Sequence, residues 1–162
     1  MKQAISKHNH QVQKEKETNL IDGCNCQDAS NCPMDGNCQA RGIIYQATVV
    51  EENGTTNTYT GLTGNTFKKR YDGHTYTFRN RVDSSTTLST YIWQLKDENK
   101  NYKISWKIID RGKTFNPGTR KCNLCLKEKY NIIFKPAGAT LNKRSELFSV
   151  CTHRWQKLLS KV

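Results

Sequence analysis

Two tyrosines lie in short motifs that could take part in phosphodiester hydrolysis. Tyr45 closes the apolar run Gly42-Ile43-Ile44-Tyr45, and Tyr59 opens the run Tyr59-Thr60-Gly61. Such hydrolysis needs an activated water, neutralised phosphate charge and a stabilised leaving oxygen. A tyrosine can act as general base when a metal ion and a nearby cation lower its pKa from about 10. We therefore expect Tyr45 to activate water and Tyr59 to orient water or phosphate.

Four further residues complete this candidate catalytic set. Arg70 carries a planar guanidinium that matches phosphate oxygens. His74 lies one helical turn after it, where it could contact phosphate or pass a proton. Glu128 is a hard oxygen ligand suited to Mg²⁺, and Asn142 is expected to hold the site together through amide hydrogen bonds. Taken singly, each residue has a simpler role in packing, solvation or capping, so the prediction depends on their joint occurrence.

The seven cysteines fall into two groups. Cys24, Cys26, Cys32 and Cys38 lie in a loop-rich stretch, and Cys122-x-x-Cys125 joins Cys151-x-His153 as a Cys₃His set. Sets of four thiolate and imidazole ligands suit tetrahedral structural Zn²⁺, whose filled shell leaves no position for catalysis. We expect the Cys₃His set to join the third helix to the last one. The first group is a second candidate zinc site, in which one thiol could be spare. The alternative for the Cys₃His set is buried free cysteines.

The positive charge of the chain is concentrated in its body. The formal net charge is +12, residues 1–40 carry −1, and residues 41–162 carry 22 Lys and Arg against 9 Asp and Glu, a net of +13. Such a surface attracts polyanions through counterion release, although it also serves solubility. No apolar run approaches the roughly 20 residues of a membrane span, and the polar N-terminus lacks the pattern of a signal peptide. We expect an intracellular chain with no membrane partner.

The hydrophobic pattern predicts the elements that must position these residues. Strands are expected at 43–50, 58–62 and 103–110, with the turn 51–54 joining the first two. Helices are expected from a cap at Asn65 or Thr66 through Phe78, from the Thr86-Thr87 pair onward, over 121–134, and over 145–159. The segment 135–140 is expected to be a turn. The predicted order is therefore β-β-α-α-β-α-α, an α+β fold with a small central antiparallel three-stranded sheet flanked by helices.

Three regions follow from this pattern. Residues 1–21 form a polar linker or helical lead-in. Residues 22–40 form a cysteine-rich knot that needs a metal or the neighbouring domain to hold its shape. Residues 41–162 form the catalytic domain.

This order of residues and elements resembles the GIY-YIG endonuclease family over roughly residues 41–145. The first motif is Ile43-Ile44-Tyr45, with Gly42 one place earlier than usual, and in the second motif Thr60 replaces the usual isoleucine. We expect this change to affect packing and not chemistry. Arg70, Glu128 in the Glu-x-x-x-Ile pattern and Asn142 match the remaining family positions. The cysteines, Tyr91-Ile92-Trp93 and Cys151-Thr152-His153 resemble the endonuclease domain of Penelope-like retroelements.

The resemblance implies a Mg²⁺-dependent endonuclease that nicks DNA during retroelement integration. The partner is then DNA, together with a reverse transcriptase of the same element, and DNA as the substrate implies a nuclear location. Nothing in the chain resembles a polymerase, so it is a released C-terminal segment or a truncated or repurposed copy. The alternative is a catalytically inactive, zinc-stabilised basic module that binds nucleic acid. The substitution of Thr60 for isoleucine and the missing polymerase motivate this alternative.

Overall fold

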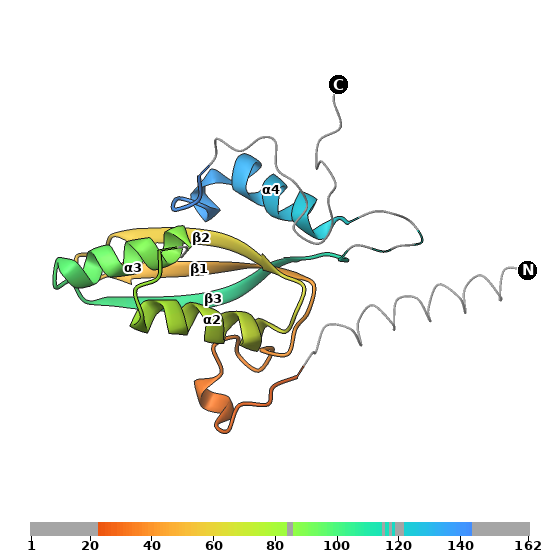
Figure 1. Ribbon diagram of the computed structural model, residues 1–162, viewed down its shortest axis with the longest axis horizontal. Helices are drawn as coiled ribbons and strands as arrows, with labels where there is room; N and C mark the ends of the chain where they lie inside the picture. Colours follow the sequence, from red (N-terminus) through yellow and green to blue (C-terminus); the bar gives the residue numbers. More distant parts are fainter. Residues whose placement is uncertain (1–22, 84–85, 115, 117, 119–121, 144–162) are drawn as a thin grey trace, which may run out of the picture.

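The computed structural model describes residues 23–83, 86–114, 116, 118 and 122–143. These residues form the predicted α+β fold, with one antiparallel sheet of three strands and three α-helices (Figure 1). The strands are β1 (Ile43–Glu51), β2 (Thr56–Thr63) and β3 (Tyr102–Arg111), in the order β2-β1-β3. β1 therefore lies at the centre and pairs with both neighbours. The tight turn between β1 and β2 uses Gly54, whose φ of 86° favours glycine.

The two faces of the sheet are covered by different helices. Side chains alternate along a strand, so Tyr45 and Gln46 of β1 point to opposite faces. On the Tyr45 side lies α2 (Phe67–Arg79), whose Phe67 ring is 5.3 Å from the Tyr45 ring. On the other side, Gln46 Nε2 donates to the carbonyl of Gly138 at 2.8 Å. Gly138 ends the short helix η2 (Pro136–Gly138), which follows α4 (Leu124–Phe134), and Figure 1 shows the sheet between α2 and α4.

Helix starts follow the capping residues of the sequence. Thr66 caps α2 by accepting from the amide of Lys69. Thr86 caps α3 (Thr87–Asp97) in the same way through Ser89. The expected apolar face of α3 is buried at Leu88, Ile92 and Leu95.

Some element bounds differ from the prediction. β2 begins at Thr56, two residues early, because the ladder with β1 continues to the turn. The helix predicted over 121–134 is α4, which begins at Leu124. The predicted turn at 135–140 contains η2. The lead-in 1–21 and the helix predicted over 145–159 lie outside the described residues.

The cysteine-rich segment has little regular structure of its own. Within residues 23–40 there is one single-turn helix, η1 (Ala29–Asn31), and no strand. Cys38 and Ala40 are nevertheless fully buried and belong to the main apolar core. The predicted knot is therefore joined to the domain at its C-terminal end. In the described part of the chain, no helix is both long and apolar enough to cross a membrane.

Candidate functional site

Tyr45 is the centre of a buried hydrogen-bonded group. Its side chain is fully buried, and its ring is surrounded by Phe67, His74 and Trp106 at centroid distances of 5.3, 5.9 and 5.9 Å. Nε of Arg70 donates to the Tyr45 hydroxyl at 2.9 Å, and that hydroxyl lies 2.7 Å from Nε2 of His74. Because the guanidinium can only donate, the phenolic proton is available to His74. The fold thus brings three of the predicted site residues into direct contact.

The glycine of the second motif makes room for this tyrosine. Gly61 lies opposite Tyr45 in the ladder between β1 and β2. A Cβ atom at Gly61 would come within 2.5 Å of the Tyr45 hydroxyl and 2.9 Å of the Tyr59 ring. Any larger residue would displace both tyrosines. This close approach is the physical reason for glycine at this position.

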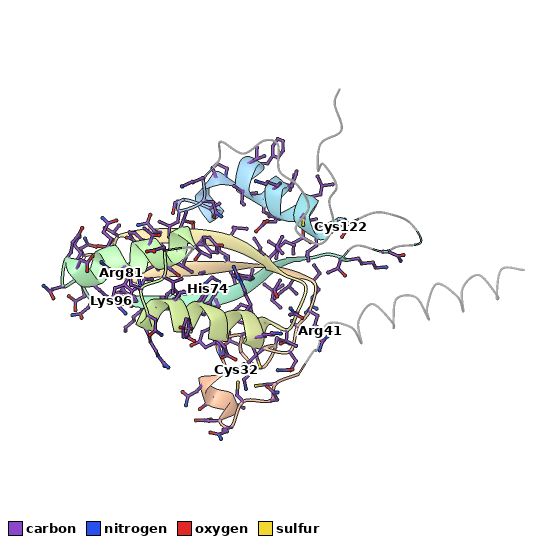
Figure 2. All side chains as sticks on the ribbon, in the orientation of Figure 1. Cys32, Arg41, His74, Arg81, Lys96 and Cys122 are labelled. Atoms are coloured by element: carbon purple, nitrogen blue, oxygen red, sulfur yellow. The ribbon has the colours of Figure 1, made fainter. Side chains whose placement is uncertain are left out.

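His74 is placed to exchange a proton with Tyr45 and not to meet solvent. The ring is 2% exposed, lies between α2 and the sheet (Figure 2), and stacks on Phe78 at 5.9 Å. Burial, followed by the charge on Arg70, lowers the His74 pKa to about 3. Its Nε2 is therefore an acceptor for the Tyr45 proton. Of the two predicted roles, this geometry suits proton transfer, because the ring offers almost no surface to a phosphate.

Both tyrosines hold their protons firmly. Burial raises the pKa of Tyr45 above its ordinary value, and the positive charge of Arg70 only partly opposes this effect. Burial also raises the pKa of Tyr59, which is 8% exposed. The lowered pKa expected for Tyr45 is thus not produced by Arg70 alone. Without a cation beyond Arg70, Tyr45 is a hydrogen-bonding phenol.

Glu128 completes the electrostatic environment from a different element. It lies on α4, partly buried, and burial raises its pKa to about 7. Its charge in turn raises the pKa of Tyr45 and Tyr59, so the carboxylate is close to both. Among the described residues no hydrogen bond or ion pair holds this carboxylate. Burial makes the charged form of this carboxylate costly, and the charges of Lys129 and Arg70 offset only part of that cost. This is not the environment of an ordinary surface glutamate.

Neighbouring residues fix α4 to the sheet and so determine where Glu128 lies. Lys127 forms a 2.8 Å ion pair with Asp110 and also donates to the carbonyl of Arg111, both at the end of β3. The Asn123 side chain accepts from the amide of Lys113 at 2.6 Å. Leu124 and Ile132 bury the inner face of the helix. The carboxylate therefore faces the site from a helix fixed at its first turns.

Asn142 binds the backbone of the second motif. Its Oδ1 accepts from the amide of Thr60 and its Nδ2 donates to the carbonyl of Thr60, each at 2.8 Å. This pair of bonds continues the ladder along the free edge of β2. Thr60 itself is buried, and its hydroxyl donates to the carbonyl of Gly138 at 2.8 Å. Thr60, between Tyr59 and Gly61, is thus held through both its backbone and its side chain.

The first cysteine group assembles as predicted. The Sγ atoms of Cys24, Cys26, Cys32 and Cys38 all lie within 4.8 Å of one another. Cys38 Sγ is 3.6 Å from Cys24 Sγ and 3.7 Å from Cys26 Sγ. Four sulfurs about 2.3 Å from a tetrahedral zinc are separated by about 3.8 Å. The four thiols, called the cysteine cluster below, could therefore bind a metal such as zinc.

The electrostatics of the cysteine cluster also favour a cation. The hydrogen bond with Cys24 is the main cause that raises the Cys26 pKa to about 12. Burial would raise the Cys32 pKa as well, but the amides of Met34 and Gly36 lower it to about 7. These amides come from a turn with positive φ at Asp35 and Gly36. One thiolate is therefore stabilised by the backbone, and the others need a positive ion before they ionise together.

The second cysteine group is only partly described. Cys122 is half-buried and Cys125 is buried at the start of α4. Cys151 and His153 lie outside the described residues, so this ligand set remains a prediction. Figure 2 shows Cys32 and Cys122 at well-separated places, with Cys32 beyond α2 and Cys122 near α4. The described cysteines of the two groups thus lie apart.

One residue in the site was not predicted to be there. Trp106 of β3 packs against Tyr45, and its ring lies 5.3 Å from that of His74. The alternation of Ile104, Trp106 and Ile108 marks the face of the strand that is buried. Nothing in that pattern says that this face lies against Tyr45, because the pairing of β3 with β1 is a tertiary event.

Comparison with known proteins gives no match. No family model matches the chain, and neither a curated protein nor a solved structure matches it significantly. The functional assignment therefore rests on the residues of the site and on their geometry.

Proposed function

We propose that this chain is a Mg²⁺-dependent DNA endonuclease of the GIY-YIG type. The observation that carries the proposal is the Tyr45 hydroxyl, which bonds Arg70 and His74 while Glu128 lies near enough to influence its pKa. Clusters of titratable groups whose pKa values are shifted by burial and by one another are typical of functional sites. This group offers a water-activating oxygen, a phosphate-binding fork and a metal ligand.

The residues suggest how water could be activated. The phenol of Tyr45 accepts from Arg70 and donates to His74. Because its side chain is fully buried, this mechanism requires that binding of DNA and metal admit a water to the remaining lone pair of its oxygen. As that water attacks phosphorus, its proton passes to the Tyr45 oxygen and the phenolic proton passes to Nε2 of His74. Because the pKa of His74 is about 3, the proton rests on Tyr45 until the attack begins. The relay avoids a free tyrosinate in a buried site.

The phosphate and the leaving oxygen need positive charge. Arg70 donates to Tyr45 through Nε and also interacts with Tyr59. The remaining donors of its guanidinium can bind phosphate oxygens. Glu128 is a hard oxygen donor that fits Mg²⁺, an ion often held by one or two carboxylates with waters and substrate phosphates. When bound, Mg²⁺ would stabilise the charge that develops on the leaving oxygen. The partly buried Glu128 carboxylate, for which the described residues provide no hydrogen bond, supports this role.

The surface around the site suits a polyanion. A hollow of about 600 Å³ at the end of the sheet is lined by Arg41, Gly42 and Lys113 without an acidic side chain. Together with the +13 charge of residues 41–162, these residues support DNA as the substrate. The resemblance alone suggests retroelement integration, a reverse transcriptase partner and a nuclear location.

We also propose that zinc occupies the cysteine cluster and has a structural role. The sulfur spacing supports this assignment, and four thiolates would leave no open position for a substrate. A second zinc bound by Cys122, Cys125, Cys151 and His153 remains part of the same proposal.

The test is a supercoiled-plasmid assay with the full chain, with and without Mg²⁺, alongside Glu128→Gln. We expect relaxed circles only when both Mg²⁺ and Glu128 are present, while DNA binding by the variant stays close to that of the wild type. Nicking that persists in Glu128→Gln would refute the assigned metal ligand. Salt-sensitive DNA binding by folded, zinc-loaded wild type without any turnover would instead establish the inactive binding module.

A further inference from the structure

The first turn of α2 is capped by the cysteine-rich segment. The first amides of an α-helix have no partner within the helix. In α2 the amide of Phe67 donates to the carbonyl of Ala40 at 2.9 Å, and that of Lys68 donates to the carbonyl of Cys38 at 2.8 Å. The next amide, of Lys69, reaches only the Thr66 side chain at 3.4 Å. Two of the first three amides of α2 are therefore satisfied by Cys38, the last residue of the cysteine cluster, and by Ala40, two residues later.

A lysine on the same turn reaches the other end of the cysteine cluster. Nζ of Lys68 donates to the carbonyl of Asn25 at 3.3 Å and to its Oδ1 at 3.1 Å. Asn25 lies between Cys24 and Cys26, and Gln39 also donates to its Oδ1, at 2.7 Å. Lys68 thus contacts both ends of the cysteine cluster. Its side chain binds Asn25, between Cys24 and Cys26, and its amide binds the Cys38 carbonyl.

These contacts lie next to the candidate active site. Arg70 follows Lys68 by two residues and donates to Tyr45, and His74 follows one turn later. The segment that caps the helix has a single 3₁₀ turn and no strand in residues 23–40. Its shape therefore depends on the cysteine cluster, whose four thiols are drawn from positions up to 14 residues apart.

We propose that metal binding by the cysteine cluster fixes the start of α2 and thereby positions Arg70 for the reaction. The cluster acts through the carbonyls of Cys38 and Ala40 and through the Lys68–Asn25 contact. Loss of the metal frees these groups, so the first turn of α2 frays and the guanidinium loses its fixed place beside Tyr45. Residues 24–38 are then a positioning element for the reaction. The effect on turnover rests on the proposed nuclease function, whereas the effect on α2 does not.

The first test measures amide hydrogen exchange, which needs no activity. Cys26→Ser removes one ligand of the cysteine cluster, and Cys122→Ser is the matched cysteine change at α4. In Cys26→Ser we expect the amides of Phe67 and Lys68 to exchange at least tenfold faster, while Ile92 in α3 keeps its protection. In Cys122→Ser the two α2 amides should keep theirs. Unchanged exchange at Phe67 and Lys68, or equal loss of protection throughout the sheet and α3, would overturn the proposal.

The second test leaves all four thiols in place. Lys68→Met removes the contact with Asn25, and Lys69→Met removes the same charge from the neighbouring exposed position. Both variants should retain the zinc content of the wild type. At saturating DNA, kcat for nicking should fall about tenfold in Lys68→Met and stay within twofold in Lys69→Met, with faster exchange at Phe67 only in the former. Equal values of kcat and equal exchange in the two variants would contradict the positioning role.

These readouts separate the two proposals. A wild type that never nicks DNA would refute the proposed function, and the exchange measurements would still decide whether the cysteine cluster holds α2. Normal nicking combined with unchanged exchange in Cys26→Ser and Lys68→Met would refute the positioning role alone.

Discussion

The two halves of the candidate site are built differently. On the α2 side, Tyr45, Arg70 and His74 are bonded to one another and enclosed by aromatic rings. On the α4 side, Glu128 is partly buried and has no hydrogen bond or ion pair within the described part of the chain. One half is held by hydrogen bonds between its own side chains, and the other half has a carboxylate that a cation would stabilise. If the proposed function is correct, the groups for proton transfer are preorganised, whereas the metal ligand is not held by a hydrogen bond from the described residues.

The largest effect should come from the preorganised half. Tyr45→Phe removes the hydroxyl that joins Arg70 and His74 and keeps the packed ring. General acid–base groups contribute about 10²- to 10⁴-fold, so we expect a loss of that size in single-turnover nicking. Stability should fall by about 1–3 kcal/mol, because the buried His74 and Arg70 nitrogens lose their shared partner.

The control for this prediction is another tyrosine of the same aromatic cluster. Tyr71 packs on Phe67 and Trp106 at centroid distances of 6.1 and 5.7 Å. Tyr71→Phe should keep the nicking rate within about threefold of the wild type. Similar rates for the two variants would mean that the hydroxyl of Tyr45 is only structural.

The pH dependence of Mg²⁺ binding tests the α4 side of the site, which contains Glu128. Because burial raises the Glu128 pKa to about 7, protons compete with the metal below that pH. The affinity for Mg²⁺ should therefore fall about tenfold from pH 8 to pH 6, as measured by calorimetric titration of the full chain. Glu128→Gln should bind weakly at both pH values. A wild-type affinity that is constant over this range would show that Glu128 is not a buried, proton-competing ligand.

The same raised pKa has a consequence for stability. A carboxyl group whose pKa is higher in the folded state favours folding in its protonated form. This contribution is present below about pH 4.5 and is lost as the pH rises to about 7. Added Mg²⁺ should restore stability at pH 8 in the wild type and not in Glu128→Gln, as followed by thermal unfolding.

The difference between the halves also explains what the sequence could predict. The strands, the caps at Thr66 and Thr86 and the helical spacing of Arg70 and His74 depend on local patterns, and the structure follows them. The grouping of four cysteines within residues 24–38 was also visible in the sequence, and the structure brings their thiols together. These features need only short-range information.

Other features depend on how distant segments dock, and the sequence could not predict them. The burial of Glu128 follows from the contact between Lys127 and Asp110, two residues on different elements that look like ordinary surface charges. The proton acceptor of Tyr45 is known only once α2 lies across β1. The Cys38 carbonyl caps α2 and so joins the cysteine-rich segment to a helix with which it shares no motif. Each is a tertiary contact without a periodic signal.

The smallest effect is expected at Asn142, which supports both halves from the edge of β2. Asn142→Ala removes two hydrogen bonds to Thr60, which should cost about 1–3 kcal/mol in urea unfolding. Nicking should fall only a few-fold, because pairing with β1 still holds Tyr59 and Gly61 in register.

The matched control is the exposed Asn65, for which we expect no change in either measurement. A loss of turnover far greater than the loss of stability would contradict this interpretation. It would mean that the Asn142 amide contacts the reacting groups and belongs with Glu128 in the half of the site that only substrate and metal complete.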